Sequence, residues 1–440
     1  MNEKRIRIGI AGFGTVGCGV AKILFDQKET IQQKTGANLE LAKIVDLDIT
    51  TPRSVDVPEE LLSTDIDDIA CDESIDIAVV LVGGTTAAKD IQIKMLQSGK
   101  NVVTANKALL AKHGAELFSV ARENNVCIAF EASCAGGIPI ISAIRTGLAA
   151  NDIERIYGIL NGTSNYILTC MEQNGDDFPD VLERAQELGY AEADPTLDIN
   201  GGDCGHKLAI IASLCFGCEF EFADVTYEGI EKIAITDIEC GREMGYSLKL
   251  LGVAEKQPCG EYTLQVSPSF VASDEIIAQV PGPFNAVSLF GNCVGHTMYY
   301  GRGAGMMPTA SAVTADIIEI VSGNSKQLFD NLKLKPREET KPLVADIKDQ
   351  QKRFYIRIQA KDEPGVLAKM SSALGENGIS IRGALQQEAP AQKNYVTVVI
   401  TTHKTSRNMI DDALKKIDEM NIIAGEPVCI QIVEIPGDEG

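Results

Sequence analysis

A glycine-rich turn between an apolar strand and an expected helix constrains the fold of this chain most. Residues 5–10, RIRIGI, end in an apolar run, and AGFGTVGCGVAKILF follows directly. Its glycines fit G-x-G-x-x-G, in which the first permits a tight turn, the second lets a pyrophosphate approach the backbone and the third allows close helix packing. The alternative is a glycine-rich turn that binds nothing. The pattern predicts a dinucleotide site made by Gly12, Phe13, Gly14, Thr15, Val16 and Gly17.

Strand-like and helix-like segments alternate after this turn. Further strands are expected at 39–48, 75–84, 100–106 and 126–134. Such an alternation is typical of α/β proteins with a parallel sheet. We therefore expect a Rossmann-type, doubly wound sheet that forms a nucleotide-binding domain over residues 1–134.

Polar residues at the strand ends indicate how a cofactor would bind. Asp46 ends the second strand, where a carboxylate would bind a ribose 2′-hydroxyl and repel a 2′-phosphate. This mildly favours NAD, although Arg53 or Lys43 could still bind the phosphate of NADP. Gly84 and Thr85 close another strand at the carboxyl edge of the sheet, where ligands bind in open α/β folds.

A charged segment lies at residues 190–207, YAEADPTLDINGGDCGHK, and carries four carboxylates and a terminal lysine. If a helix begins near Gly202, Asp203 and Lys207 stand four residues apart on one helix face. This arrangement predicts a site for a small charged substrate, and the alternative is a surface loop with an ordinary ion pair. Lys107, before another expected helix, is either a solvated residue or a charge directed into the cofactor cleft.

Composition narrows the class of protein. The net charge of −22 argues against nucleic acid or an anionic membrane as partner. No apolar run reaches the roughly 18 residues of a membrane span, and the N-terminus leads straight into a strand without a signal peptide. The 12 cysteines are scattered as reduced thiols would be, and the only CxxC, Cys215 to Cys218, has no second pair to form a zinc site. A cytoplasmic, multi-domain enzyme or sensor is expected.

The C-terminal quarter predicts a separate module. Residues 324–353 are polar and charged and resemble a linker in composition. The unit that follows, residues 354–435, has the β-α-β-β-α-β order of a ferredoxin-like fold. Its expected strands are 354–361, 379–389, 394–402 and 427–435.

Six motifs resemble those of homoserine dehydrogenases and occur in that family's order over about the first 330 residues. They are GFGTVG, TANKALL, EASCAGGIPI, NGTSNYIL, GYAEADPTLDINGGDCGHK and GRGAGMMPTASAV. The resemblance implies NAD- or NADP-dependent interconversion of L-homoserine and L-aspartate 4-semialdehyde in threonine, methionine and isoleucine biosynthesis. It also implies a catalytic and dimerisation domain over 135–323, with about 300–323 completing the nucleotide-binding domain.

The same resemblance implies roles for individual residues. Lys207 would donate and accept the proton, and Lys107 would be the second catalytic lysine. Asp198 and Asp203 match acidic residues that hold homoserine and orient Lys207, and Glu192 would pair with the substrate ammonium.

Further matches concern the substrate carboxylate, the cofactor and a cation. Gly162 and Thr163 lie in the polar turn expected to meet the carboxylate, and Gly305 is expected at the cofactor. A monovalent cation, expected to be sodium, would be held by Glu131 and the backbone carbonyls of Cys134, Gly136 and Ile138. One departure is Val45, where many family members carry an arginine, and it puts a preference for NADP in doubt.

The C-terminal module resembles an ACT domain, an amino-acid-sensing unit, in the segment DEPGVLAKMSSALGENGISI. The resemblance implies feedback inhibition by L-threonine, with Asp362, Gly365 and Asn377 as ligand contacts. The alternative is a dimerisation module that has lost its ligand.

Two other functions remain open from the sequence. One is a catalytically silent amino-acid-binding regulator on the same scaffold, although such a protein has no chemical need for both lysines. The other is a related oxidoreductase, for which a semialdehyde dehydrogenase would need a nucleophilic cysteine such as Cys134. No aspartate kinase segment precedes the first strand, so the bifunctional form is not expected, and a homodimer or homotetramer is.

Overall fold

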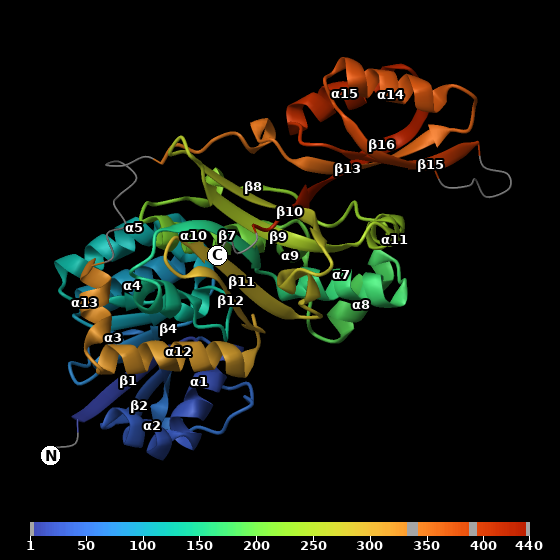
Figure 1. Ribbon diagram of the computed structural model, residues 1–440. Coiled ribbons are helices and arrows are strands. Elements are labelled where there is room, and N and C mark those ends of the chain that lie inside the picture. Colours follow the sequence, from blue (N-terminus) through green and yellow to red (C-terminus); the bar gives the residue numbers. More distant parts are fainter. Residues whose placement is uncertain (1–3, 332–341, 387–393, 437–440) are drawn as a thin grey trace. The chain divides into compact units, whose positions relative to one another are not determined.

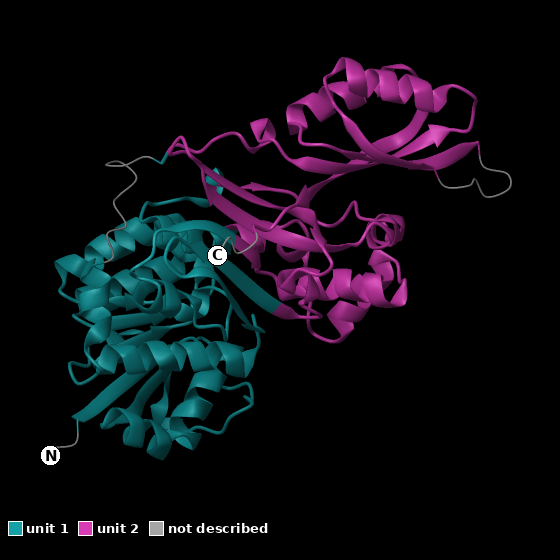
Figure 2. Ribbon diagram, in the orientation of Figure 1, with its two compact units in different colours: residues 1–156, 206–224, 285–342 teal, residues 157–205, 225–284, 343–440 magenta. Residues whose placement is uncertain are grey.

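The computed structural model describes residues 4–331, 342–386 and 394–436. They form two compact units, one of residues 1–156, 206–224 and 285–342 and the other of 157–205, 225–284 and 343–440 (Figure 2). The chain passes from one unit to the other within strand β7, Ile153–Ile159, and within helix α10, Gly202–Phe216. Among the described helices, none combines the length and the apolar character needed to cross a membrane.

The first unit contains a six-stranded parallel sheet in the order β3-β2-β1-β4-β5-β6. Its strands are β1 Lys4–Ala11, β2 Ala37–Val45, β3 Leu62–Ser63, β4 Ile77–Val80, β5 Asn101–Thr104 and β6 Ile128–Ala129. This order confirms the expected doubly wound sheet. The expected strand 126–134 is too long, because Glu131–Ser133 form a short 3₁₀ helix in which Glu131 turns to a neighbouring helix.

Helices cover this sheet and bring a distant segment back to it. They are α1 Thr15–Asp26, α2 Lys28–Thr35, α3 Asp67–Ala70, α4 Ala87–Gln97, α5 Lys107–Glu123, α6 Ile140–Ser142, α12 Met306–Val321 and α13 Asn324–Asn331. Helix α12 lies beside α1 (Figure 1). The two helices pack so closely that a Cβ on Gly19 would lie 2.8 Å from the Ala310 Cβ. Ile10, Val79 and Val313 are among the fully buried residues of the shared core. Residues 285–302, with strand β12 (Gly295–Arg302) and most of β11 (Phe284–Gly291), also belong to this unit.

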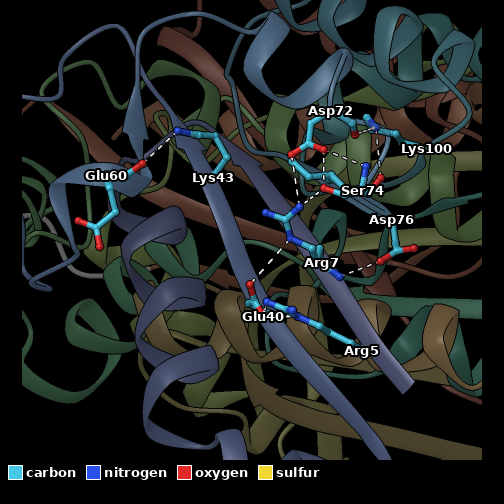
Figure 3. A network of polar contacts seen from close by, with 10 residues as sticks. Arg5, Arg7, Glu40, Lys43, Glu60, Asp72, Ser74, Asp76 and Lys100 are labelled. Atoms are coloured by element: carbon cyan, nitrogen blue, oxygen red, sulfur yellow. Dashed lines mark hydrogen bonds and ion pairs between the residues drawn. The ribbon is translucent and has the colours of Figure 1, made fainter. Parts of the chain in front are cut away.

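A network of charged side chains lies where the parallel strands begin (Figure 3). The Arg7 N–H donates to the Asp76 carboxylate at 2.8 Å, and the Arg7 guanidinium lies 3.5 Å from Asp72. Lys100 is buried, and its ammonium donates to the backbone oxygens of Asp72 at 2.7 Å and Ile75 at 3.2 Å. Ligands bind at the opposite, carboxyl edge of such sheets, so this network serves stability.

The second unit is an α+β layer whose sheet runs β9-β10-β16-β13-β15-β14, with β8 paired to β10. Its strands are β8 Thr226–Tyr227, β9 Tyr246–Lys256, β10 Tyr262–Ala272, β13 Arg353–Lys361, β14 Ile381–Gln386, β15 Tyr395–Thr402 and β16 Ile423–Val433. Its helices are α7 Gly162–Asn174, α8 Phe178–Glu187, α9 Thr196–Ile199, α11 Ile235–Glu243, α14 Val366–Glu376 and α15 Arg407–Glu419.

The C-terminal part of this unit has the β13-α14-β14-β15-α15-β16 order of the expected ferredoxin-like module. Ile356, Ile358, Met370, Ile400 and Ile410 are buried in its core. The last strand also runs parallel to β10, pairing 269–271 with 431–433, so the module and the middle of the chain share one sheet. Residues 387–389 of the expected strand 379–389 lie outside the described part of the chain.

The expected linker 324–353 needs a correction. Its first eight residues form α13, and Phe329 in that helix is fully buried against the ring of Phe118, with a centroid distance of 5.5 Å. Packing of the apolar Phe329 side chain stabilises this helix within an otherwise polar segment, and the average composition of the segment does not reveal it. Residues 332–341 lie outside the described residues. The compact units also end at other positions than the expected domains 1–134, 135–323 and 354–435, which remain proposals.

Candidate active site

The glycine-rich turn has the geometry that a dinucleotide needs. Gly12 has a φ of +103°, its N–H donates to the Val45 oxygen at 2.8 Å, and a Cβ there would lie 2.9 Å from the Leu81 backbone. A Cβ on Gly17 would lie 2.2 Å from the Gly12 oxygen, whereas one on Gly14 would meet no atom within 4 Å. Two of the glycines therefore make the turn possible, and Gly14 leaves open space above the start of α1.

The carboxylate after β2 holds this turn in place. Asp46 accepts hydrogen bonds from the N–H groups of Phe13 at 2.5 Å and Asp48 at 3.0 Å. The Arg53 guanidinium lies 3.9 Å from the Asp46 carboxylate and 3.7 Å from that of Asp48. A positive charge thus stands beside the carboxylate that was expected to bind a ribose.

Asn106 links the two neighbouring strand ends. Its side-chain amide donates to the backbone oxygens of Val82 at 3.1 Å and Gly84 at 2.7 Å. Its side-chain oxygen caps helix α5 by accepting from the N–H three residues further on, at 3.0 Å. Lys107 is the first residue of that helix, and Thr85 follows the tethered turn; both are half-buried. The sequence had not singled out Asn106.

A buried amide connects two of the expected acidic residues. The Asn161 side-chain amide donates to the carboxylates of Asp198 at 2.7 Å and Asp203 at 2.8 Å. Its oxygen accepts from the Ser164 N–H at 2.8 Å and so caps α7. One side chain therefore fixes the start of a helix and the positions of two carboxylates. Sequence reasoning missed this role, although an asparagine before a turn of small polar residues is a recognisable N-cap signal.

Other side chains of residues 161–164 (NGTS) also bond to the charged segment 190–207. The Thr163 hydroxyl donates to the Tyr190 oxygen at 2.6 Å, and the Ser164 hydroxyl donates to the Asp198 oxygen at 2.6 Å. Gly162 is half-buried at the start of α7. The turn thus organises the protein's own carboxylates, and the Thr163 hydroxyl is engaged with backbone.

Helix α10 begins at Gly202, as expected from the sequence. Asp203 and Lys207 lie one turn apart on it and expose only 5% and 8% of their surface. Charged residues are rarely this buried unless partners surround them, and Asn161 is one such partner of Asp203. Glu192 is exposed, and its described hydrogen bond is from Gln186 to its backbone oxygen, so the structure does not bring its carboxylate to Asn161.

Glu131 is buried and bonded at the start of α6. Its carboxylate accepts from the N–H groups of Ile141 at 2.8 Å and Ser142 at 2.7 Å. Its own N–H donates to the Asp316 carboxylate at 2.9 Å. Burial raises the pKa of Glu131 to about 7, with the two backbone hydrogen bonds opposing the shift.

The backbone after Glu131 fits an oxygen-lined cation site. Gly136 has a φ of +48°, and a Cβ there would lie 2.3 Å from the Gly303 oxygen. Among the described backbone hydrogen bonds outside helices and strands, none ends on the carbonyls of Cys134 or Gly136, whereas the Ile138 oxygen accepts from Ile140 at 2.8 Å. No group of three or more His, Cys, Asp or Glu side chains in the described residues could hold a metal. The backbone carbonyls of Cys134 and Gly136 and the carboxylate of Glu131 are hard oxygen donors, the type that monovalent cations prefer.

Two of the three expected regulatory residues meet at one cavity. Asp362 and Gly365 line a cavity of about 350 Å³ before α14, together with Gln386. Asn377 does not line it, because its amide donates to the Ala373 oxygen at 2.6 Å and its oxygen accepts from Lys416 at 3.0 Å.

Gly305, expected at the cofactor, has a φ of +118° and precedes α12.

Comparisons with known proteins show which family the chain resembles. The family model for homoserine dehydrogenase matches residues 139–318, that for the homoserine dehydrogenase NAD-binding domain matches 12–131, and that for the ACT domain matches 354–420. The homoserine dehydrogenase of Pseudomonas aeruginosa is 42% identical over 98% of this chain and 100% of its own length.

Solved structures give the same result. The homoserine dehydrogenase of Thiobacillus denitrificans matches with a TM-score of 0.89 and 37% identity, covering 98% of this chain and 99% of its own. A hyperthermophilic archaeal homoserine dehydrogenase in complex with NADPH matches with a TM-score of 0.60 and 28% identity over 72% of this chain and 97% of its own. The chain therefore belongs to the homoserine dehydrogenase family, as a nicotinamide-dependent oxidoreductase with a C-terminal ACT domain.

Proposed function

We propose that the start of α10 is the catalytic centre for interconversion of L-homoserine and L-aspartate 4-semialdehyde. A bound nicotinamide cofactor would supply the hydride for C4 of the semialdehyde in the reductive direction. Lys207 delivers a proton to the oxygen on that carbon as negative charge develops there, and it takes the proton back in the oxidative direction. Lys107 is the second catalytic lysine, and Asp203 orients Lys207.

The observation that carries this proposal is the cluster of Asn161, Asp198 and Asp203. A buried amide donor between two carboxylates fixes their positions without neutralising them. Two ordered carboxylates suit a substrate that carries an ammonium group. We assign the exposed Glu192, which Asn161 does not hold, as a further partner of that ammonium. The Gly162–Thr163 turn supports these groups, so we assign it a positioning role in place of direct contact with the substrate.

Replacing Lys207 tests the assignment. Lys207→Ala is expected to lose most of kcat for homoserine oxidation. Binding of NADH or NADPH, followed by the fluorescence of the reduced nicotinamide, should stay unchanged. Full turnover in this variant would remove Lys207 from the mechanism. A catalytically silent regulator, the alternative from the sequence, has no support from the comparisons, because both dehydrogenase domains match their family models.

For the cofactor we propose NAD with retained use of NADP. Gly12 to Gly17, Gly84 and Thr85, and Gly305 would form the phosphate and nicotinamide sides of the site. Asp46 after Val45 disfavours a 2′-phosphate, while Arg53 at 3.9 Å partly offsets that charge. Comparing kcat/KM for the two cofactors checks this: Arg53→Gln should lower the value for NADP more than that for NAD.

We further propose that Glu131 and the carbonyls of Cys134, Gly136 and Ile138 bind a monovalent cation, sodium in the first instance. Support comes from the carbonyls of Cys134 and Gly136, on which no described backbone hydrogen bond ends, and from the left-handed backbone at Gly136. Thermal unfolding in sodium chloride should occur at higher temperature than in an equal concentration of tetramethylammonium chloride. Equal midpoints would count against the site.

Finally, we propose that L-threonine inhibits the enzyme by binding in the cavity at Asp362 and Gly365. We also propose that the enzyme serves threonine, methionine and isoleucine synthesis. Its proposed location is the cytoplasm, and its proposed state is a homodimer or homotetramer. The ACT domain supports the regulatory part. Threonine should lower activity in the wild type and not in Asp362→Asn. Absence of any effect on activity or thermal stability would favour a module that has lost its ligand.

A further inference from the structure

A second cavity in the C-terminal half of the chain lies where β16 joins β10, apart from the cavity at Asp362. It has a volume of about 340 Å³ and is built from the second unit alone. The charged residues among its lining are Lys348, Lys352, Arg407 and Glu228. Polar lining of mixed charge distinguishes it from a gap in an apolar core.

Lys352 is the cation in this cavity that lacks a carboxylate partner. Its ammonium reaches only the side-chain oxygens of Gln265 and Gln431, both at 3.4 Å, and no described carboxylate lies within ion-pair distance of it. The Gln431 amide donates to Ser267 at 2.9 Å and Ser269 at 2.8 Å, which turns its oxygen toward Lys352. Burial lowers the pKa of Lys352, with the more distant Glu255 opposing the shift. An anion in the cavity would supply the missing partner.

Arg407 provides a second cationic group. Its Nε donates to Asp411 at 2.8 Å, and the Lys348 ammonium lies 3.6 Å from the same carboxylate. One terminal nitrogen of Arg407 makes a long contact of 3.5 Å with the Cys429 oxygen. Lys348, Lys352 and Arg407 give three positive charges against two negative charges from Asp411 and Glu228, so the net charge here is +1.

We propose that this cavity binds a small acidic amino acid, with one carboxylate on Lys352, the other on Arg407 and the ammonium on Glu228. Such a ligand carries a net charge of −1, which balances the site. Charge-assisted hydrogen bonds to Lys and Arg are the strong ones, so they decide the affinity. The proposal is independent of threonine binding at Asp362 and Gly365.

The wall of the cavity at Glu228–Ile230 packs against helix α9, which carries Asp198. Ligand binding in the cavity is therefore expected to affect catalytic activity. The Glu228 N–H donates to Val266 in β10 at 2.8 Å, and the Ile230 N–H donates to the Ile199 oxygen at 2.8 Å. A Cβ on Gly229 would lie 2.2 Å from that Ile199 oxygen. A shift of Glu228 toward a bound ammonium would therefore move the end of helix α9, which carries Asp198.

Equilibrium dialysis of the full-length enzyme with L-aspartate or L-glutamate tests the site. Saturating homoserine is included so that the substrate site is filled. We expect saturable binding at one site per chain, at least tenfold weaker in Lys352→Met and restored in Lys352→Arg. Lys232→Met is the control, because Lys232 lies in the same unit with an exposed side chain outside the cavity. Lys352→Met removes a cation that has no carboxylate partner, so its thermal midpoint should not fall.

Several outcomes would overturn the proposal. Neither acid binding the wild type at millimolar concentration, or Lys352→Met binding as the wild type does, would remove the site. Succinate binding as tightly as L-aspartate would remove the role of Glu228. Loss of binding in Asp362→Asn but not in Lys352→Met would place the ligand at the other cavity and leave the threonine proposal standing.

Discussion

The substitution Asn161→Asp isolates what the buried amide does at the proposed catalytic centre. An aspartate has the same shape and is as good an N-cap, so the hydrogen bond to Ser164 and the start of α7 are kept. What changes is the donor: an NH₂ group bonded to two carboxylates becomes an oxygen facing them. The variant therefore separates ordering of Asp198 and Asp203 from ordering of the helix.

The size of the effect follows from the two hydrogen bonds. Each bond to a charged group contributes about 1.5–3 kcal/mol, so about 3–6 kcal/mol of positioning is lost. At about 1.4 kcal/mol per tenfold, kcat/KM for homoserine should fall by about 10² to 10⁴. Repulsion among three carboxylates also raises the pKa of the introduced group, so lowering the pH protonates it and restores a donor.

The assay is steady-state homoserine oxidation by Asn161→Asp across acidic and neutral pH, with circular dichroism to confirm folding. The activity of the variant relative to the wild type should rise as the pH falls. Asn174→Asp is the matched control, because it makes the same chemical change on an exposed position of α7. Wild-type kcat/KM in Asn161→Asp would refute the role of the amide.

Three further results are expected. Gly14→Ala should weaken cofactor binding in a titration without lowering the thermal midpoint, because a Cβ there meets open space, whereas Gly17→Ala should also lower the midpoint, because its Cβ would lie 2.2 Å from a backbone oxygen. Asp237→Ala should cost about 3–5 kcal/mol in urea unfolding. Its fully buried carboxylate accepts from Arg357 at 2.6 and 3.0 Å. Cys134 is fully buried, and burial raises the pKa of its thiol to about 12. Mass spectrometry after iodoacetamide treatment of the native enzyme should therefore find Cys134 unmodified. Rapid alkylation would instead support a mechanism with Cys134 as the nucleophile.

Local patterns in the sequence predicted the elements that depend on local chemistry. The glycine turn at 12–17 and the start of α10 at Gly202 follow from backbone requirements and helix periodicity, and the structure has both. Helix α13 was missed because a single buried aromatic, Phe329, carries its packing, and composition averages over such a residue.

Contacts between distant segments could not be predicted in this way. The bond from Asn161 to Asp203 joins residues 42 positions apart, and the pairing of β16 with β10 joins strands about 160 apart. Asn161 also looks like an ordinary helix cap in sequence, so only the fold reveals its second function.

The central claim, that Lys207 moves the proton, is tested most directly by chemical rescue. The measurement is kcat for homoserine oxidation by Lys207→Ala, without and with added methylamine at saturating cofactor. Without the amine, kcat should fall by about 10² or more, as expected for loss of a positioned acid–base group, and methylamine should restore part of it in proportion to its concentration. Wild-type kcat without any amine would contradict the account.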